Sequence, residues 1–130
     1  MTYVDTSVVL AYVFGEGRRP PPEFWTRDRL VSSRVTEFEG WVRTQAYGRA
    51  DTHGSALAGA IAALDLVAID DAACARCRAP FPVPVRTLDA IHLATIDFLR
   101  TRGLAVRLAT YDERMRQAAS AMNIPLVELP

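Results

Sequence analysis

Short apolar runs alternate with longer amphipathic stretches along this chain. The runs at residues 3–4, 30–32, 66–69 and 105–110 predict buried strands, and a last short strand is expected at residues 125–129. The stretches at residues 6–14, 35–48, 52–64, 86–102 and 112–123 predict helices, with a shorter helix at residues 23–29. Strands that alternate with helices are typical of a parallel sheet with helices on its faces.

Glycine and proline mark where these elements stop. Residues 15–22, Gly-Glu-Gly-Arg-Arg-Pro-Pro-Pro, cannot form a helix or a central strand and predict an exposed loop. Pro80, Pro82 and Pro84 interrupt the chain before the helix at residues 86–102, and Gly103 is expected to end that helix.

Length and composition indicate a single domain, residues 1–130, because half of the residues are hydrophobic and can supply a core. No apolar run approaches the roughly 20 residues that cross a bilayer, and no signal-peptide pattern opens the chain, so we expect a cytoplasmic protein with no membrane partner. The formal net charge is zero, and all 15 basic residues are arginine. Any nucleic-acid site must therefore come from local groups of arginines and not from a global field.

The two cysteines form the sequence Cys74-Ala-Arg-Cys77. A structural zinc ion needs four ligands, and the chain has no second cysteine pair, while His53 and His92 lie far away in sequence. A redox pair stays open as the minor alternative, since the cysteines follow a predicted strand.

Two acids follow predicted strands directly. Asp5 comes after the first strand and Asp112 after the strand at residues 105–110. Ligands of open parallel sheets bind at the carboxyl ends of the strands, so both carboxylates are expected at that edge.

Two further acids lie on the apolar faces of predicted helices. At 100° per residue, Glu39 falls within about 60° of Val35, whereas Glu37 points about 160° away from Glu39. Asp89 shares a side with His92 by the same geometry. Carboxylates are seldom buried unless they are paired or bind metal, which makes Glu39 and Asp89 candidate site residues.

Each acid also has a structural alternative. Asp5 and Asp112 could cap the helices that follow them, and Glu39 and Asp89 could pair with Arg43 and Arg86. Four clustered carboxylates would repel one another without a cation, however, and a hard divalent ion, Mg²⁺ or Mn²⁺, suits oxygen ligands best.

Four motifs in order carry a family resemblance. They are Val4-Asp5-Thr6-Ser7; Ser33, Thr36 and Glu39 in a Ser-x-x-Thr-x-x-Glu pattern; Arg86-Thr-Leu-Asp89-Ala-Ile-His92-Leu-Ala-Thr95; and Ala109-Thr110-Tyr111-Asp112-Glu-Arg114. With them the chain resembles the PIN-domain ribonucleases, specifically the VapC-type toxins of toxin–antitoxin pairs.

The resemblance implies a PIN-like three-layer α/β/α sandwich with a short, mainly parallel central sheet. It also implies a four-acid, Mg²⁺-dependent site, in which Mn²⁺ could substitute. The implied catalytic residues are Asp5, Glu39, Asp89 and Asp112, of which Asp5, Asp89 and Asp112 would hold the metal. Thr6 and Thr110 would support them, and we interpret His92 as a packing or supporting side chain because neutral imidazole is a poor Mg²⁺ ligand. Glu37, an additional acid, leaves open whether it assists or replaces Glu39.

The activity implied by the resemblance is hydrolysis of RNA phosphodiesters by metal-activated water, with Glu39 orienting or deprotonating that water. The substrate phosphates would be bound by arginines, for which the candidates are Arg18, Arg19, Arg43 and Arg86. The implied partners are RNA, a cognate VapB-type antitoxin and a second copy of the chain. Four aromatic residues are candidate antitoxin contacts or, equally, core or dimer residues: Phe24, Trp25, Phe38 and Trp41. The alternative function is a non-catalytic PIN-like module that binds RNA or protein. Such a module would be expected to have lost an acid, and none of the four is missing.

Overall fold

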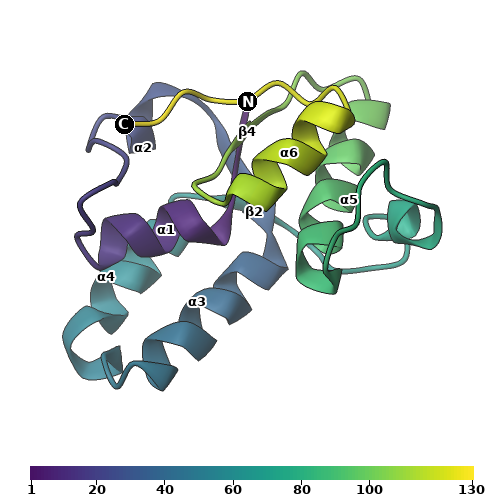
Figure 1. Ribbon diagram of the computed structural model, residues 1–130. Coiled ribbons are helices and arrows are strands. Elements are labelled where there is room, and N and C mark those ends of the chain that lie inside the picture. The colour runs from purple at the N-terminus through teal and green to yellow at the C-terminus, as the bar shows by residue number, and fades with distance from the viewer.

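The computed structural model describes all 130 residues as four strands and six α-helices, with one 3₁₀-helix (Figure 1). In chain order these are β1 (Thr2–Val4), α1 (Thr6–Val13), α2 (Phe24–Arg27), β2 (Leu30–Ser33), α3 (Arg34–Ala46), α4 (Ala50–Ala62), β3 (Asp65–Val67), η1 (Ala75–Arg78), α5 (Thr87–Thr101), β4 (Arg107–Ala109) and α6 (Glu113–Ala121). None of the helices combines the length and the apolar character needed to span a bilayer.

The strands form one parallel sheet in the order β3-β2-β1-β4. β1 lies at the centre, with Tyr3 opposite Val31 on one side and Leu108 on the other. The predicted strand at residues 125–129 is wrong as a full strand, because only Leu126 forms an isolated parallel bridge, to Leu108. Proline lacks the N–H that would extend the ladder at residue 125.

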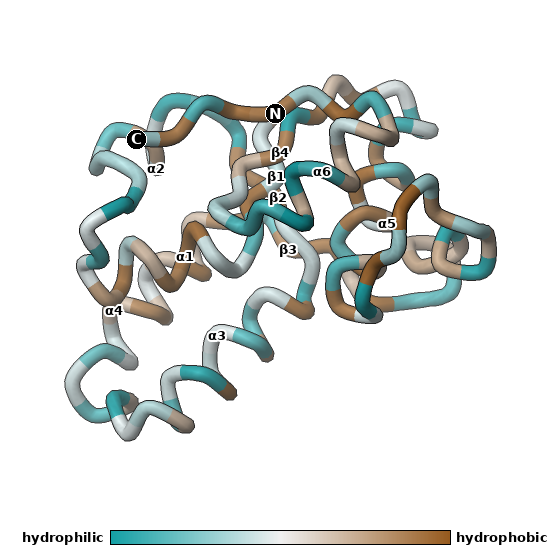
Figure 2. Tube along the Cα trace, viewed as in Figure 1, coloured by the Kyte–Doolittle hydropathy of each residue, from teal (hydrophilic) through white to brown (hydrophobic).

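Successive residues of the strands point to opposite faces and supply two separate cores. Tyr3, Val31 and Leu108 pack toward α5 and α6, whereas their neighbours Val4 and Ala109 pack toward α1 and α4. Figure 2 shows the result: α1 and the central strands are mostly hydrophobic, while α3 is largely pale or hydrophilic. The predicted α/β/α sandwich is confirmed.

The segment between β3 and α5 adds a feature that the apolar pattern did not predict. Ala75–Arg78 form the 3₁₀-helix η1, which packs against α5. Cys74 and Cys77 flank and enter this turn as free thiols. Gly103 has a φ of 84°, which explains why a glycine follows the end of α5 as predicted.

Candidate active site

Asp5 lies at the carboxyl end of the central strand and begins α1. It is 5% exposed, and its Oδ2 accepts hydrogen bonds from Thr110 Oγ1 at 2.8 Å and from Ser7 Oγ at 2.7 Å. Its Oδ1 lies 3.5 Å from Nε2 of His92. Two hydroxyls that lie far apart in the sequence therefore fix one oxygen of Asp5, and the other oxygen lies beside His92.

Helix α3 directs Glu39 toward the same strand ends. Its Oε1 accepts hydrogen bonds from Thr6 Oγ1 at 2.8 Å and from His92 Nε2 at 2.9 Å. On the other side of the imidazole, the Tyr3 hydroxyl lies 2.7 Å from Nδ1 and accepts a hydrogen bond from Ser33 N at 3.1 Å. With its oxygen already accepting, Tyr3 can donate its proton to Nδ1, which leaves the Nε2 proton for Glu39.

The histidine and the glutamate shift each other's protonation. Burial by itself lowers the pKa of His92, but the hydrogen bond that it donates to Glu39 and the charges of Asp5 and Glu39 outweigh burial and raise that pKa. Burial by itself raises the pKa of Glu39, but the hydrogen bond and charge of His92, with help from Thr6, bring it below its usual value. Both shifts come largely from the hydrogen bond between His92 Nε2 and Glu39, which holds the Glu39 carboxylate in place.

Asp89 and Asp112 complete the group of acids. Asp89 lies in the first turn of α5, and Asp112 caps α6 through Oδ1, which accepts hydrogen bonds from Arg114 N at 2.8 Å and Met115 N at 3.3 Å. Burial and then the negative charges of Asp112 and Asp5 raise the pKa of Asp89. The contacts place the three acids at one edge of the sheet: Thr110 Oγ1 donates to Asp5 and accepts from Asp112 N at 3.0 Å. Asp89 lies one turn before His92 on α5, and His92 Nε2 is 3.5 Å from Asp5.

The donor chemistry of this edge fits a hard divalent cation, since it consists of carboxylate and hydroxyl oxygens. A cation would also offset the repulsion that raises the pKa of Asp89. No group of three or more His, Cys, Asp or Glu side chains is nevertheless arranged to hold a metal ion. The fit is therefore one of chemistry and proximity and not of a preformed coordination sphere.

The structural alternatives hold for two of the four acids. Asp5 and Asp112 do cap α1 and α6, so each combines a capping role with its place at the site. The proposed pairs of Glu39 with Arg43 and of Asp89 with Arg86 are absent from the ion pairs of the chain. Helix surface pairing therefore does not account for Glu39 or Asp89.

Glu37 is turned away from this site. Its Oε2 lies 3.1 Å from Arg34 Nη1 in an i,i+3 pair on the surface of α3, whereas the Glu39 side chain is only 14% exposed and contacts His92. The helical-geometry prediction that only one of the two faces the strand ends is confirmed.

Comparison with known proteins agrees with this architecture. The model of the family described as "PIN domain" matches residues 2–121. The chain belongs to the PIN domain family. It is 32% identical over 133 residues to Ribonuclease VapC35 of Mycobacterium tuberculosis strain H37Rv. This alignment covers 98% of this chain and 96% of that protein. It is 32% identical over 128 residues to Ribonuclease VapC46 of the same strain, and this alignment covers 96% of this chain and 95% of that protein.

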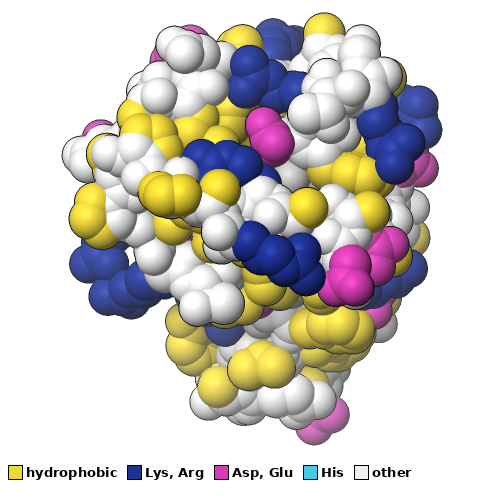
Figure 3. All heavy atoms as spheres, turned by 90° about the vertical axis from the view of Figure 1, so that its right-hand side faces the viewer, with side chains coloured by type: hydrophobic (Ala, Val, Ile, Leu, Met, Phe, Trp, Pro, Cys, Tyr) yellow, Lys and Arg dark blue, Asp and Glu magenta, His cyan; other side chains and the backbone are white.

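The four candidate arginines are placed unequally around the acids of this PIN domain. Arg43 lines a pocket with Ser7 and Asp112, and Arg86 lines another with Asp89. Arg18 lies over the ring of Tyr111, 5.3 Å from its centroid, and Arg19 donates to the carbonyl oxygens of residues 15 and 16 within its own loop. Figure 3 shows arginines scattered over one face of the molecule without a continuous basic surface, as expected for a chain with no net charge.

Three side chains at this PIN-domain site were not predicted in their observed roles. Ser7, named above only as part of the first motif, donates to Asp5 and accepts a hydrogen bond from Tyr111 N at 3.0 Å. Tyr3, expected only as strand core, orients His92. Its buried hydroxyl was the available signal, because a buried tyrosine hydroxyl needs a partner. Arg114 lines the pocket beside Asp89, and no sequence signal separated it from the other arginines.

The four aromatic candidates also divide. Phe24, Trp25 and Trp41 pack against the core beneath α1 and α4, whereas Phe38 is 52% exposed on α3. Val42, one turn further along α3, is 67% exposed. Of the four aromatics, only Phe38 is therefore placed to contact a partner of this PIN domain with most of its surface.

Proposed function

We propose that this PIN domain is a Mg²⁺-dependent endoribonuclease and the toxin of a type II toxin–antitoxin pair, acting in the cytoplasm. The observation that supports it best is the convergence of Asp5, Asp89 and Asp112 at the carboxyl edge of the sheet, where burial and the two other charges raise the pKa of Asp89. The VapC ribonucleases that the chain resembles over nearly their whole length supply the substrate class.

Asp5, Asp89 and Asp112 would hold Mg²⁺, and Mn²⁺ could take its place. A bound ion of this kind lowers the pKa of its water and neutralises charge on the phosphoryl oxygens. Thr110 and Ser7 already hold Oδ2 of Asp5, so the carboxylate needs little reorganisation before it binds.

Glu39 would orient or deprotonate the attacking water. Its pKa lies below the usual value in spite of burial, so the carboxylate is ionised at neutral pH and can accept a hydrogen bond from that water. Thr6 and His92 donate to Oε1 at 2.8 and 2.9 Å, so the second oxygen, Oε2, would be the one to contact the water. Thr6 and Thr110 are thus supporting residues.

The protein partners follow from the same family relationship. We propose a VapB-type antitoxin and a homodimer, with the exposed apolar strip formed by Phe38 and Val42 on α3 as the contact for one of them. The alternative function, a PIN module that binds RNA without cutting it, would keep the fold and the arginines but would not need the orientation of Glu39.

The test is cleavage of a mixed RNA pool by the purified protein with Mg²⁺, Mn²⁺ or a chelator. Asp5→Asn, Asp89→Asn and Glu39→Gln are each expected to lower the cleavage rate by at least a hundredfold. Glu37→Gln is the matched control, because it removes the same charge two residues away from Glu39 and should leave the rate within about twofold. Binding of Mn²⁺, followed by electron paramagnetic resonance, gives a readout apart from activity. A folded protein that neither binds Mn²⁺ nor cuts RNA would support the non-catalytic module instead.

A further inference from the structure

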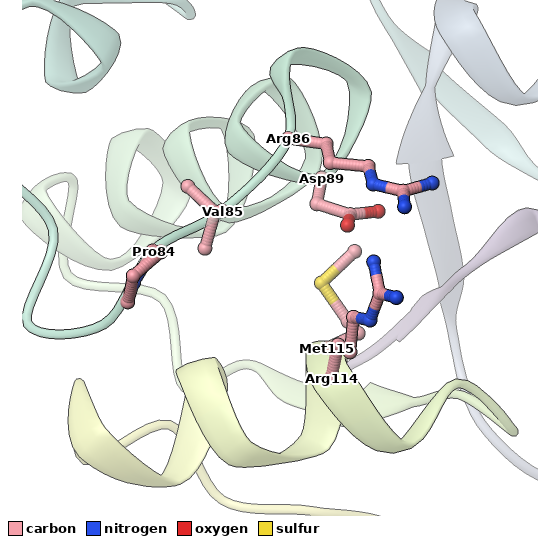
Figure 4. Close-up of a pocket in the computed structure, with 6 residues that line it drawn as sticks. All are labelled: Pro84, Val85, Arg86, Asp89, Arg114 and Met115. Carbon is pink, nitrogen blue, oxygen red and sulfur yellow. The ribbon is translucent and has the colours of Figure 1, made fainter.

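A cavity lies beside Asp89, and most of its lining residues are not acids. It has a volume of about 340 Å³ and lies between the segment that leads into α5 and the first turn of α6 (Figure 4). Its lining residues are Pro84, Val85, Arg86, Asp89, Arg114 and Met115. A cavity of this size is at the lower end of the range that holds small ligands, and its walls are part apolar and part charged.

Two arginines flank the carboxylate in this cavity. Figure 4 shows the guanidinium groups of Arg86 and Arg114 on either side of Asp89, with Arg114 rising from α6 toward the carboxylate. Neither arginine takes part in any ion pair of the chain, not even with Asp89. Both residues are exposed, so their donors are open to a ligand.

Both arginines lie at the N-terminal end of a helix, where a positive charge does not stabilise the helix. Arg86 occupies the N-cap position of α5 without a side-chain capping bond, and Arg114 is the second residue of α6. The N-terminal end of a helix carries partial positive charge, so a cation there is unfavourable. Neither folding nor ion pairing accounts for the two positive charges at this point.

The chemistry of the cavity matches a nucleotide. Two planar guanidinium forks bind phosphate oxygens in pairs, and single-stranded RNA is recognised by contacts to unstacked bases as well as to phosphates. Val85, which is only partly buried, offers an apolar wall for a base, whereas Met115 is 1% exposed and forms the floor of the cavity.

We propose that Arg86 and Arg114 form a phosphate clamp for single-stranded RNA, which binds the nucleotide next to the scissile bond and places its base against Val85. The inference rests on the proposed nuclease function, since the clamp adjoins the acid site at Asp89. It adds Arg114 to the substrate contacts and assigns Arg86 a defined position.

The clamp is tested by the binding of a labelled single-stranded RNA oligonucleotide in the presence of a chelator, which prevents hydrolysis. Fluorescence anisotropy is measured at several salt concentrations for Arg86→Ala, Arg114→Ala and a matched control, Arg27→Ala. Arg27 is also exposed and belongs to no ion pair, but it lies on α2, where it lines a different pocket. All three variants carry the same net charge.

Arg86→Ala and Arg114→Ala are each expected to weaken binding about tenfold. Each should also reduce the slope of log K against log salt concentration by about 0.7, the value for one lost phosphate contact on a single strand. Arg114→Lys should keep the slope but recover only part of the affinity, because lysine lacks the fork. Arg114→Ala should melt no lower than the unsubstituted protein, which separates lost binding from lost folding.

The outcomes separate the clamp from the nuclease. If both alanine variants bind RNA as Arg27→Ala does, while Asp5→Asn still abolishes cleavage, the clamp is refuted and the nuclease stands. If the arginine variants lose affinity as stated but no metal-dependent cleavage is found with the unsubstituted protein, the clamp stands and the nuclease function fails.

Discussion

Substitution of Tyr3 by phenylalanine is expected to destabilise the protein well beyond the loss of one oxygen atom. The Tyr3 hydroxyl accepts from Ser33 N at 3.1 Å and lies 2.7 Å from Nδ1 of His92. Tyr3 is 0% exposed, and Ser33 and His92 are each 1% exposed. The change therefore leaves a buried N–H and a buried imidazole nitrogen without a partner.

The size of the effect follows from those two groups. A buried polar group left without a hydrogen bond costs roughly 1–3 kcal/mol, so two of them lower the free energy of unfolding by about 2–6 kcal/mol. A domain of this kind has about 5–15 kcal/mol in total. The fold should survive the substitution but lose a large part of its margin.

Urea unfolding followed by circular dichroism at pH 7 measures this difference, and an unchanged m value shows that the unfolded state is the same. Tyr47→Phe is the matched control, since Tyr47 is 58% exposed. It should change the free energy of unfolding by less than about 0.5 kcal/mol. If Tyr3→Phe falls within that same limit, the Tyr3–His92 hydrogen bond does not order the site as inferred.

Three further predictions concern charge and packing. Asp89→Asn should raise the melting temperature of the metal-free protein. Burial and the charges of Asp112 and Asp5 raise the pKa of Asp89, so its ionised form is unfavourable in the folded state. An unchanged or lower melting temperature would contradict this repulsion. The Thr2 hydroxyl, opposed by burial and aided by the chain amino group, lowers the pKa of Asp28 to about 2 from an unfolded value of 3.8. The stability that Asp28 contributes is therefore present above about pH 4 and lost as the pH falls toward about 2. Asp28→Asn should flatten that part of a stability profile measured by chemical unfolding. Gly40→Val should lower the free energy of unfolding by about 1–3 kcal/mol, because a Cβ there comes within 3.0 Å of Leu57 Cδ1, whereas Gly59→Val, with nothing within 4 Å, should be nearly neutral in the same assay.

The positions of the acids on the fold could be predicted from the sequence. A strand of period two followed by a helix of period 3.6 places Asp5 at a strand end. The same helical period separates Glu39 from Glu37, as their contacts with His92 and Arg34 show. These features depend on residues within a few positions of one another, so local patterning is enough to find them.

The partners of those acids were decided by tertiary structure alone. Tyr3 and His92 are 89 positions apart, and Asp5 and Thr110 are 105 apart. Periodicity shows which face a side chain takes, but it does not show which residue from a distant element faces it. Whether Arg114 lies beside Asp89 likewise depends on how α6 packs against the start of α5. The sequence by itself determined the order of the elements and the edge where the acids meet, while the packing of distant elements determined the hydrogen bonds that orient them.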